Sequence, residues 1–179
     1  MAKKIVLALL VIVAGFLTFV VTRPDTFHVE RSATIAAPAN VVYAHVVDFH
    51  AWPEWSPWEK LDPAMQRTYG GAAAGPGATY SWTGNDKVGE GKMTIVDATP
   101  PSKVGIQLDF IKPFAASNTA TFAMAPEGEQ TKVTWSMDGK NSFMSKTMSV
   151  FMSMDKMVGG DFEKGLASMK SVVEGKPKE

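Results

Sequence analysis

The 179-residue chain contains no cysteine, only three histidines and no excess of either charge. The missing cysteines exclude disulfide bonds, thiolate nucleophiles and cysteine-ligated metals. Eighteen basic and eighteen acidic side chains cancel, and no basic stripe is interleaved with aromatic residues, so we expect no nucleic-acid partner. Neither H-x-x-x-H, H-E-x-x-H nor G-x-S-x-G occurs. The sequence therefore predicts no metal, no cofactor and no hydrolase nucleophile.

A long apolar run opens the chain. Residues 5–22 carry no charge and follow Lys3 and Lys4. As a helix they would span roughly 27 Å, close to the ~30 Å hydrocarbon core of a bilayer. A cleaved signal peptide would have a shorter apolar region and a small-x-small cleavage site, which this run does not offer. The sequence favours an uncleaved anchor over residues 1–25, and the two lysines favour an extracytoplasmic, periplasmic location for the domain that follows.

After the apolar run, the sequence predicts a strand, short helices, six further strands and a C-terminal helical segment. Residues 27–36 alternate between apolar and polar side chains, with Arg31 breaking the apolar side, which predicts a half-exposed strand. Pro38 suits the first turn of a short helix. Closely spaced strand patterns joined by Gly-, Pro- and Asn-rich turns then predict an antiparallel meander. These six patterns occupy residues 65–70, 77–84, 89–100, 103–113, 117–128 and 131–139.

The last part of the sequence has a helical period. Apolar residues recur every three or four positions over residues 143–173. Gly159-Gly160 interrupts this period and Asp161 could cap a new segment, so we expect a kinked helix or two helices, the second beginning near Asp161. Met144, Met148 and Met152 step by four, and methionine adapts to irregular apolar partners. These methionines would either fill the core or line a cavity.

The stretch "FHAWPEWSPWEKLDP" at residues 49–63 holds three of the five tryptophans. Its prolines allow only a turn or two of helix. Spacing by three places Trp52, Trp55 and Trp58 on one side of such a turn. We consider three interpretations: a core plug, the rim of a ligand pocket, and contact with a membrane interface.

Two segments carry a family resemblance: "VERSATIAAPANVVYAHVVDFHAWPEWSPWEKLDP" at residues 29–63 and "MVGGDFEKGLASMK" at residues 157–170. A proline opens the first helix, an aspartate precedes the tryptophan stretch, and "DFEKGL" heads the final helix. This pattern resembles the START-like superfamily called SRPBCC, and more narrowly its polyketide cyclase/dehydrase and lipid-transport group. The resemblance implies an α+β helix-grip fold over residues 26–174. The polar end of the chain separately predicts a disordered tail at residues 175–179. In that fold a curved antiparallel sheet of about six or seven strands wraps around a long C-terminal helix and encloses an apolar cavity.

The resemblance implies a protein that binds or transports a hydrophobic small molecule, either a lipid or a polyketide-like compound. The N-terminal anchor departs from the usual soluble member, and together the two predict a membrane-anchored binding protein. We expect the cavity to be lined by aromatic and methionine side chains from the tryptophan stretch, the strands and the last helix. The predicted lining residues are Trp52, Trp55, Trp58, Tyr80, Trp82, Phe110, Phe122, Met124, Trp135, Met137, Met148, Met152 and Phe162.

Two other functions stay open. A cyclase or dehydratase would need a converged polar pair inside the cavity, and His50 with Glu54 are the candidates for general acid–base work. Glu59 and Arg67 are expected to be solvated, since a charge inside an apolar cavity must be paired. The other alternative is a protein-interaction module that uses the tryptophan-rich loop.

Overall fold

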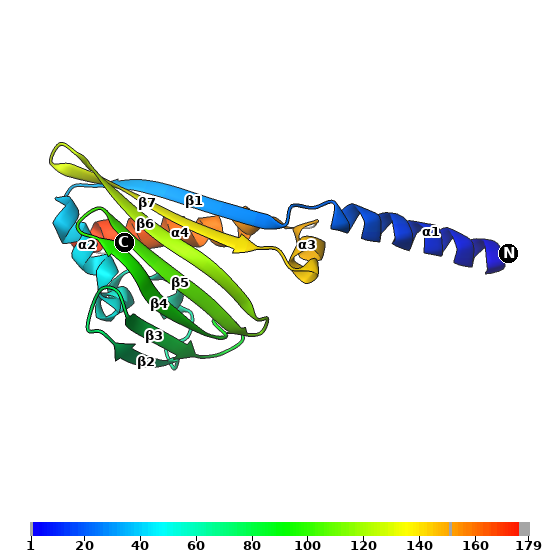
Figure 1. Ribbon diagram of the computed structural model, residues 1–179, viewed down its shortest axis with the longest axis horizontal. Helices are drawn as coiled ribbons and strands as arrows, with labels where there is room; N and C mark the ends of the chain where they lie inside the picture. Colours follow the sequence, from blue (N-terminus) through cyan, green and yellow to red (C-terminus); the bar gives the residue numbers. More distant parts are fainter. Residues whose placement is uncertain (1, 151, 176–179) are drawn as a thin grey trace.

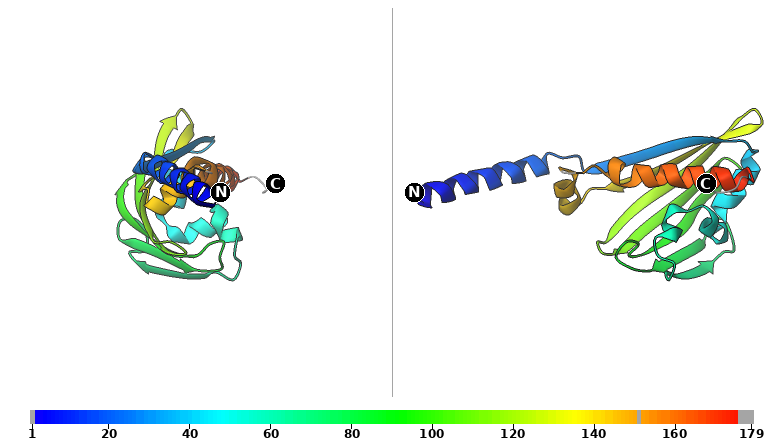
Figure 2. Two further views of the ribbon diagram at one scale, coloured as in Figure 1. Left: turned by 90° about the vertical axis from the view of Figure 1, so that its right-hand side faces the viewer. Right: turned by 180° about the vertical axis from the view of Figure 1, so that it is seen from behind.

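The computed structural model describes residues 2–150 and 152–175. Seven antiparallel strands form one sheet in the order β1-β7-β6-β5-β4-β3-β2, which curves around the last helix (Figures 1 and 2). The expected α+β helix-grip architecture is confirmed. The strands are β1 (Thr26–Ile35), β2 (Gln66–Gly71), β3 (Ala78–Thr83), β4 (Glu90–Thr99), β5 (Lys103–Lys112), β6 (Ala116–Glu127) and β7 (Gln130–Lys140). The helices are α1 (Ala2–Val21), α2 (Ala39–Val47), α3 (Phe143–Ser149) and α4 (Met154–Val173), with two 3-10 helices, η1 (Phe49–Glu54) and η2 (Pro57–Lys60).

The sheet is a meander whose first and last strands are neighbours. Each strand from β2 to β6 pairs with the strand that follows it in sequence. Strand β1 pairs with β7, so that Thr26 lies opposite Lys140 and Ile35 lies opposite Thr131. This pairing brings the start of β1 beside the end of β7. The chain therefore enters the domain from α1 at the same end of the sheet at which it leaves for α3 (Figure 1).

The inner face of the sheet packs against α4. Inward-facing side chains alternate along β6 and β7, as the two-residue period predicts, and Phe162, Leu166 and Met169 of α4 are buried against them. Gly165 lets the helix approach closely, because a Cβ there would lie 2.7 Å from Cζ3 of Trp135. The sheet and this helix face together form the main core.

The break between the last two helices is not where the sequence predicted it. Gly159 and Gly160 lie inside α4, and the chain instead turns before Ser153, whose side chain accepts a hydrogen bond from the Lys156 amide. A Cβ on Gly159 would collide with the Arg31 guanidinium, which pairs with Asp155 and Glu163 of α4. Gly159 therefore makes room for the arginine that interrupts the apolar side of β1, and the predicted helix start near Asp161 is wrong.

Helix α1 projects away from the domain (Figure 1). Only Val20 of this helix is buried. Its length and apolar composition would allow it to cross a membrane, although a signal sequence near the N-terminus has the same properties. The expected disordered tail lies outside the described residues, apart from Gly175.

Candidate functional site

The tryptophan stretch is locked onto the end of α2. The indole Nε1–H of Trp52 donates to the Val46 carbonyl at 3.1 Å, and that of Trp55 donates to the His45 carbonyl at 3.0 Å. These bonds use carbonyls that the end of a helix leaves without partners. Both indoles are buried, so neither is exposed for contact with a protein partner. Trp58 follows on η2 and is only partly buried.

Aromatic rings fill one half of the space between α4 and the sheet, on the side of α2. The Trp135 ring stacks on Phe162 with centroids 4.1 Å apart and on Phe122 at 4.7 Å. Trp55 meets Trp135 edge to face at 5.6 Å. We call this region the filled half. Its rings are at most 2% exposed, so this half acts as a packed core, and Trp135 and Phe162 form its boundary with a cavity.

The other half, on the side of α1, contains a cavity of about 250 Å³. It lies between the beginning of α4 and strands β3 to β7, and we call this region the hollow half. Eight of the predicted lining residues surround it: Trp52, Trp58, Tyr80, Trp82, Phe110, Trp135, Met137 and Phe162.

Five predicted lining residues lie elsewhere. Trp55, Phe122 and Met124 are packed into the filled half. Met148 lies on α3 and Met152 on the turn after it, and both are exposed. The reason is that α3 lies beside the end of α1, where Lys146 pairs with Asp25, and none of its residues lines the cavity. The prediction that these two methionines line the cavity is therefore wrong.

The lining also includes residues that sequence reasoning did not select. Met65, Met93, Leu108 and Ala120 complete the apolar wall. Leu108 shares the β5 face of Phe110, so strand alternation alone could have identified it. Ser56 and Glu59 come from irregular backbone around η2 and have no periodic signal.

Among the described residues, Glu59 has the one carboxylate that is buried in the cavity wall. Its side chain is only 6% exposed. Its Oε1 accepts a hydrogen bond from the Tyr80 hydroxyl at 2.5 Å, and its Oε2 accepts one from Arg67 Nε at 2.6 Å. The expectation of a solvated Glu59 is wrong, because the guanidinium and phenol replace the water that a buried carboxylate would otherwise require.

The surroundings of this cluster raise the pKa of Tyr80 and of Arg67. Burial raises the pKa of the Tyr80 phenol, and its hydrogen bond to the Glu59 carboxylate raises it further. The hydrogen bond to Glu59 raises the pKa of Arg67. At neutral pH the cavity wall therefore presents a neutral Tyr80 phenol, and Arg67 beside it stays protonated.

A further polar group in the lining is the indole of Trp135. Within residues 2–150 and 152–175, its Nε1–H has no hydrogen-bond partner although the residue is buried. Leaving a buried donor unpaired costs about 1–3 kcal/mol. An acceptor that entered the cavity and reached this group would recover that energy.

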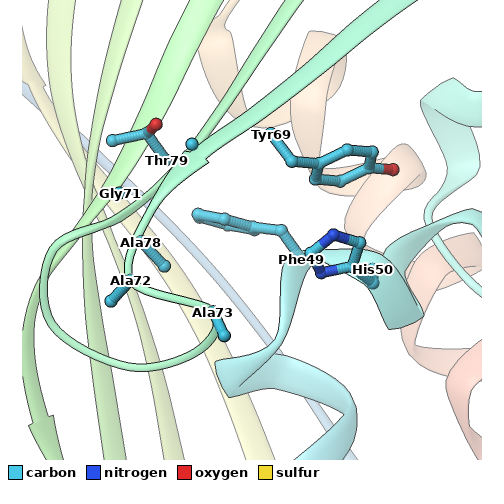
Figure 3. A pocket seen from close by; sticks show the side chains of 9 residues that line it. Phe49, His50, Tyr69, Gly71, Ala72, Ala73, Ala78 and Thr79 are labelled. Carbon is cyan, nitrogen blue, oxygen red and sulfur yellow. The ribbon is translucent and has the colours of Figure 1, made fainter.

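The proposed acid–base residues lie outside the cavity lining. His50 Nδ1 is 2.8 Å from Asp48 Oδ1, and its ring stacks on Tyr69 with centroids 4.2 Å apart (Figure 3). His50 instead borders a separate pocket of about 200 Å³ beside Phe49. Glu54 lines neither pocket. The structure thus does not bring His50 and Glu54 together around the main cavity.

The cavity opens to solvent at the end of the sheet from which α1 projects. Lys87 and Met157 are the exposed lining residues, and Val88 and Phe110 are partly buried beside them. The β3–β4 turn supplies Lys87 and Val88, and the beginning of α4 supplies Met157. The mouth and α1 therefore lie at the same end of the domain (Figure 1).

Comparisons with known proteins agree with this architecture. The family model described as polyketide cyclase / dehydrase and lipid transport matches residues 26–174. A protein from Chromobacterium violaceum has a TM-score of 0.60 at 14% identity, covering 87% of this chain and 100% of its own. A protein from Mycobacterium smegmatis gives 0.58 at 19% identity, covering 84% and 93%.

The di-domain ARO/CYC BexL from the BE-7585A biosynthetic pathway gives a TM-score of 0.61 at 16% identity, covering 90% of this chain and 54% of its own. Identities this low show a shared fold alone. A search of the curated proteins returned no match.

Proposed function

Because the chain belongs to the polyketide cyclase / dehydrase and lipid transport family, we propose that it binds a compact hydrophobic molecule between α4 and the sheet. The observation that carries this proposal is the hollow half, a cavity of about 250 Å³ walled mainly by aromatic and aliphatic side chains. Binding energy would come from burying ligand carbon, about 25 cal/mol per Å² before the costs of association.

The size and lining of the cavity narrow the ligand class. Typical small-molecule pockets have volumes of about 300–1,000 Å³. A cavity near the lower limit suits a single alkyl chain or a small aromatic body better than a two-chain lipid. Glu59 can accept a hydrogen bond from a ligand hydroxyl, and the Trp135 indole can donate one to a carbonyl or ether oxygen. We therefore favour a compact ligand with one or two uncharged oxygen groups.

The length and apolar composition of helix α1 support a location at the membrane for this binding function. As an uncleaved anchor it would hold the cavity mouth near the bilayer, where hydrophobic ligands partition. Lys3 and Lys4 favour the extracytoplasmic side for the domain. The proposed activity is then to take up a hydrophobic molecule at the membrane and carry it within reach of the anchor.

Fluorescence titration with the neutral apolar dye N-phenyl-1-naphthylamine tests the binding proposal. We expect saturable binding to the full chain, and we expect Ala120→Leu to weaken it at least tenfold because leucine would occupy the cavity. Val96→Leu, on an exposed strand position, is the matched control and should leave binding unchanged. Absence of saturable binding, or equal binding by the Ala120→Leu variant, would refute the proposal.

A second candidate function is cyclisation or dehydration of a polyketide-like substrate. The buried cluster of Glu59, Tyr80 and Arg67 favours it, because it places a carboxylate and a phenol at the cavity wall. If this cluster moves a proton, Glu59→Gln should retain dye binding within about threefold and lose turnover of an aromatic poly-β-ketone. A wild-type protein that binds such a compound and returns it unchanged would support the binding function alone.

A further inference from the structure

Exposed apolar side chains gather beside α1. Outside that helix, ten large hydrophobic side chains are exposed in the described chain, and five of them lie within the short stretch 143–157. These five, between 41% and 55% exposed, are Phe143, Met144, Met148, Met152 and Met157. We call them the methionine-rich surface. Such a concentration marks an interaction site, because soluble surfaces scatter their exposed apolar residues.

The polypeptide around Asp25 fixes this surface to the end of α1. Lys146 of α3 forms an ion pair with Asp25, and its side chain is only 12% exposed. The Asn141 amide group donates to the carbonyls of Pro24 and Thr26 at 3.0 and 3.1 Å. Helix α3 therefore lies directly beside the point where α1 leaves the domain (Figure 1).

Helix α3 carries a single charge, and that charge is paired. Lys146 is the only charged residue of α3, and its ammonium group is bound by Asp25. The remaining side chains of the helix are apolar or carry small hydroxyl groups. A surface of this composition can enter the boundary between lipid headgroups and acyl chains without burying an unpaired charge.

We propose that the methionine-rich surface inserts into the bilayer that α1 enters and holds the cavity mouth against it. This inference rests on the proposed function, in which α1 is an uncleaved membrane span. Three observations favour a bilayer as the occupant: the contact with the end of α1, the absence of a free charge on α3, and the continuity with the cavity. Met157 belongs to both the surface and the cavity lining. A hydrophobic molecule could therefore pass from lipid to cavity along methionine side chains, which adapt to different shapes.

Depth-dependent fluorescence quenching tests the inference on the full chain in vesicles of phosphatidylcholine and phosphatidylglycerol. The chain lacks cysteine, so single substitutions allow clean labelling with an environment-sensitive dye. We expect a dye at Met148→Cys to be quenched by doxyl-labelled lipids and protected from aqueous iodide. Val96→Cys is the control, since this residue is also exposed, at 55%, but lies on β4. Its dye should show the opposite pattern.

A third label separates this inference from the proposal that α1 is an anchor. A dye at Leu9→Cys on α1 should be quenched by doxyl lipids if the anchor spans the bilayer. Quenching at position 9 without quenching at position 148 would overturn the surface inference and leave the anchor intact. Loss of quenching at both positions would refute the anchor itself. Protection at position 148 from both quenchers would indicate a protein contact and would also overturn the inference.

A transfer measurement tests the functional consequence. We expect the double variant Met144→Lys and Met148→Lys to take up N-phenyl-1-naphthylamine from preloaded vesicles at least tenfold more slowly. Its affinity for the dye in buffer should stay within twofold of the wild-type value, because neither residue lines the cavity. Val96→Lys is the control for added charge. An unchanged uptake rate, or a tenfold loss of affinity in buffer, would overturn the proposed role.

Discussion

The filled and hollow halves lie under the same helix and on the same sheet, yet they are packed differently. In the filled half, Trp55 and Phe122 are completely buried and meet other rings edge to face. In the hollow half, Phe110 touches Trp82 at a centroid distance of 5.9 Å and remains partly exposed beside the mouth. Both halves are rich in aromatic residues, so composition does not distinguish core from cavity. The difference lies in whether a second element closes over the rings.

Irregular structure provides that closure. Helix η1 brings Trp52 and Trp55 over the sheet in the filled half, and α2 packs behind them through the two indole hydrogen bonds. Over the hollow half, η2 and the beginning of α4 line the wall but leave a cavity of about 250 Å³, and no residue of α3 fills it. We infer that the filled half supplies most of the stability of the domain. Substitutions in the hollow half can then change ligand binding without unfolding the domain.

Two phenylalanine substitutions provide the largest test of this contrast. Phe122→Ala in the filled half should lower the free energy of unfolding by about 3–5 kcal/mol, since it leaves a cavity among rigid rings. Phe110→Ala in the hollow half should cost about 1 kcal/mol or less, because the side chain already borders open space. Urea unfolding of both variants measures the two values.

The same two substitutions should rank in the reverse order for ligand binding, with the larger effect at Phe110. Phe110→Ala alters the cavity wall and should change the affinity for N-phenyl-1-naphthylamine, whereas folded Phe122→Ala protein should keep most of it. Equal destabilisation by the two substitutions would show that the halves do not differ in packing, and would contradict the comparison.

Much of the fold could be predicted from the sequence, because strand alternation is a local property. The six strand patterns after the tryptophan stretch correspond to β2–β7, and the apolar faces of β5, β6 and β7 point inward as expected. Eight of the thirteen expected lining residues surround the cavity, and five of these eight lie on strands, where alternation predicts the inward face. The family resemblance added the helix-grip fold and its apolar cavity, whereas the pairing of β1 with β7 is seen only in the structure.

The remainder depends on contacts between distant residues. Gly159 looks like a helix breaker in sequence, and only the position of Arg31 shows why α4 continues through it. Glu59 looks like a surface charge, and only its partners Tyr80 and Arg67 explain its burial. The methionines of α3 have the period of a cavity-lining helix, but the ion pair from Lys146 to Asp25 places them beside α1. None of these partners is close in sequence.

Two glycines of α4 test the contrast on the helix itself. A Cβ at Gly165 would meet Trp135 at 2.7 Å and Pro57 at 3.1 Å, so Gly165→Ala should cost about 1–3 kcal/mol through overpacking. Gly160 has nothing within 4 Å of its Cβ position, so Gly160→Ala should gain about 0.5–1 kcal/mol from helix propensity. Thermal or urea unfolding measures whether each substitution raises or lowers the free energy of unfolding. If Gly165→Ala raises it, the filled half is loosely packed around Gly165.

The smallest expected effect concerns the buried phenol of the hollow half. The pKa of Tyr80 is raised from its ordinary value of 10.0, so the folded protein keeps a proton that the unfolded chain releases at high pH. The unfolded state then binds fewer protons, and the free energy of unfolding falls as pH rises above about 10. Tyr80→Phe should cost about 1 kcal/mol at pH 7 through the lost hydrogen bond to Glu59. Because phenylalanine does not ionise, the variant should lose less stability than the wild type between pH 9 and pH 11, in about the range where tyrosine titrates. Urea unfolding at several pH values measures whether the free energies of unfolding of the two proteins converge. If they instead fall in parallel, the Tyr80 phenol titrates normally and water enters the hollow half freely.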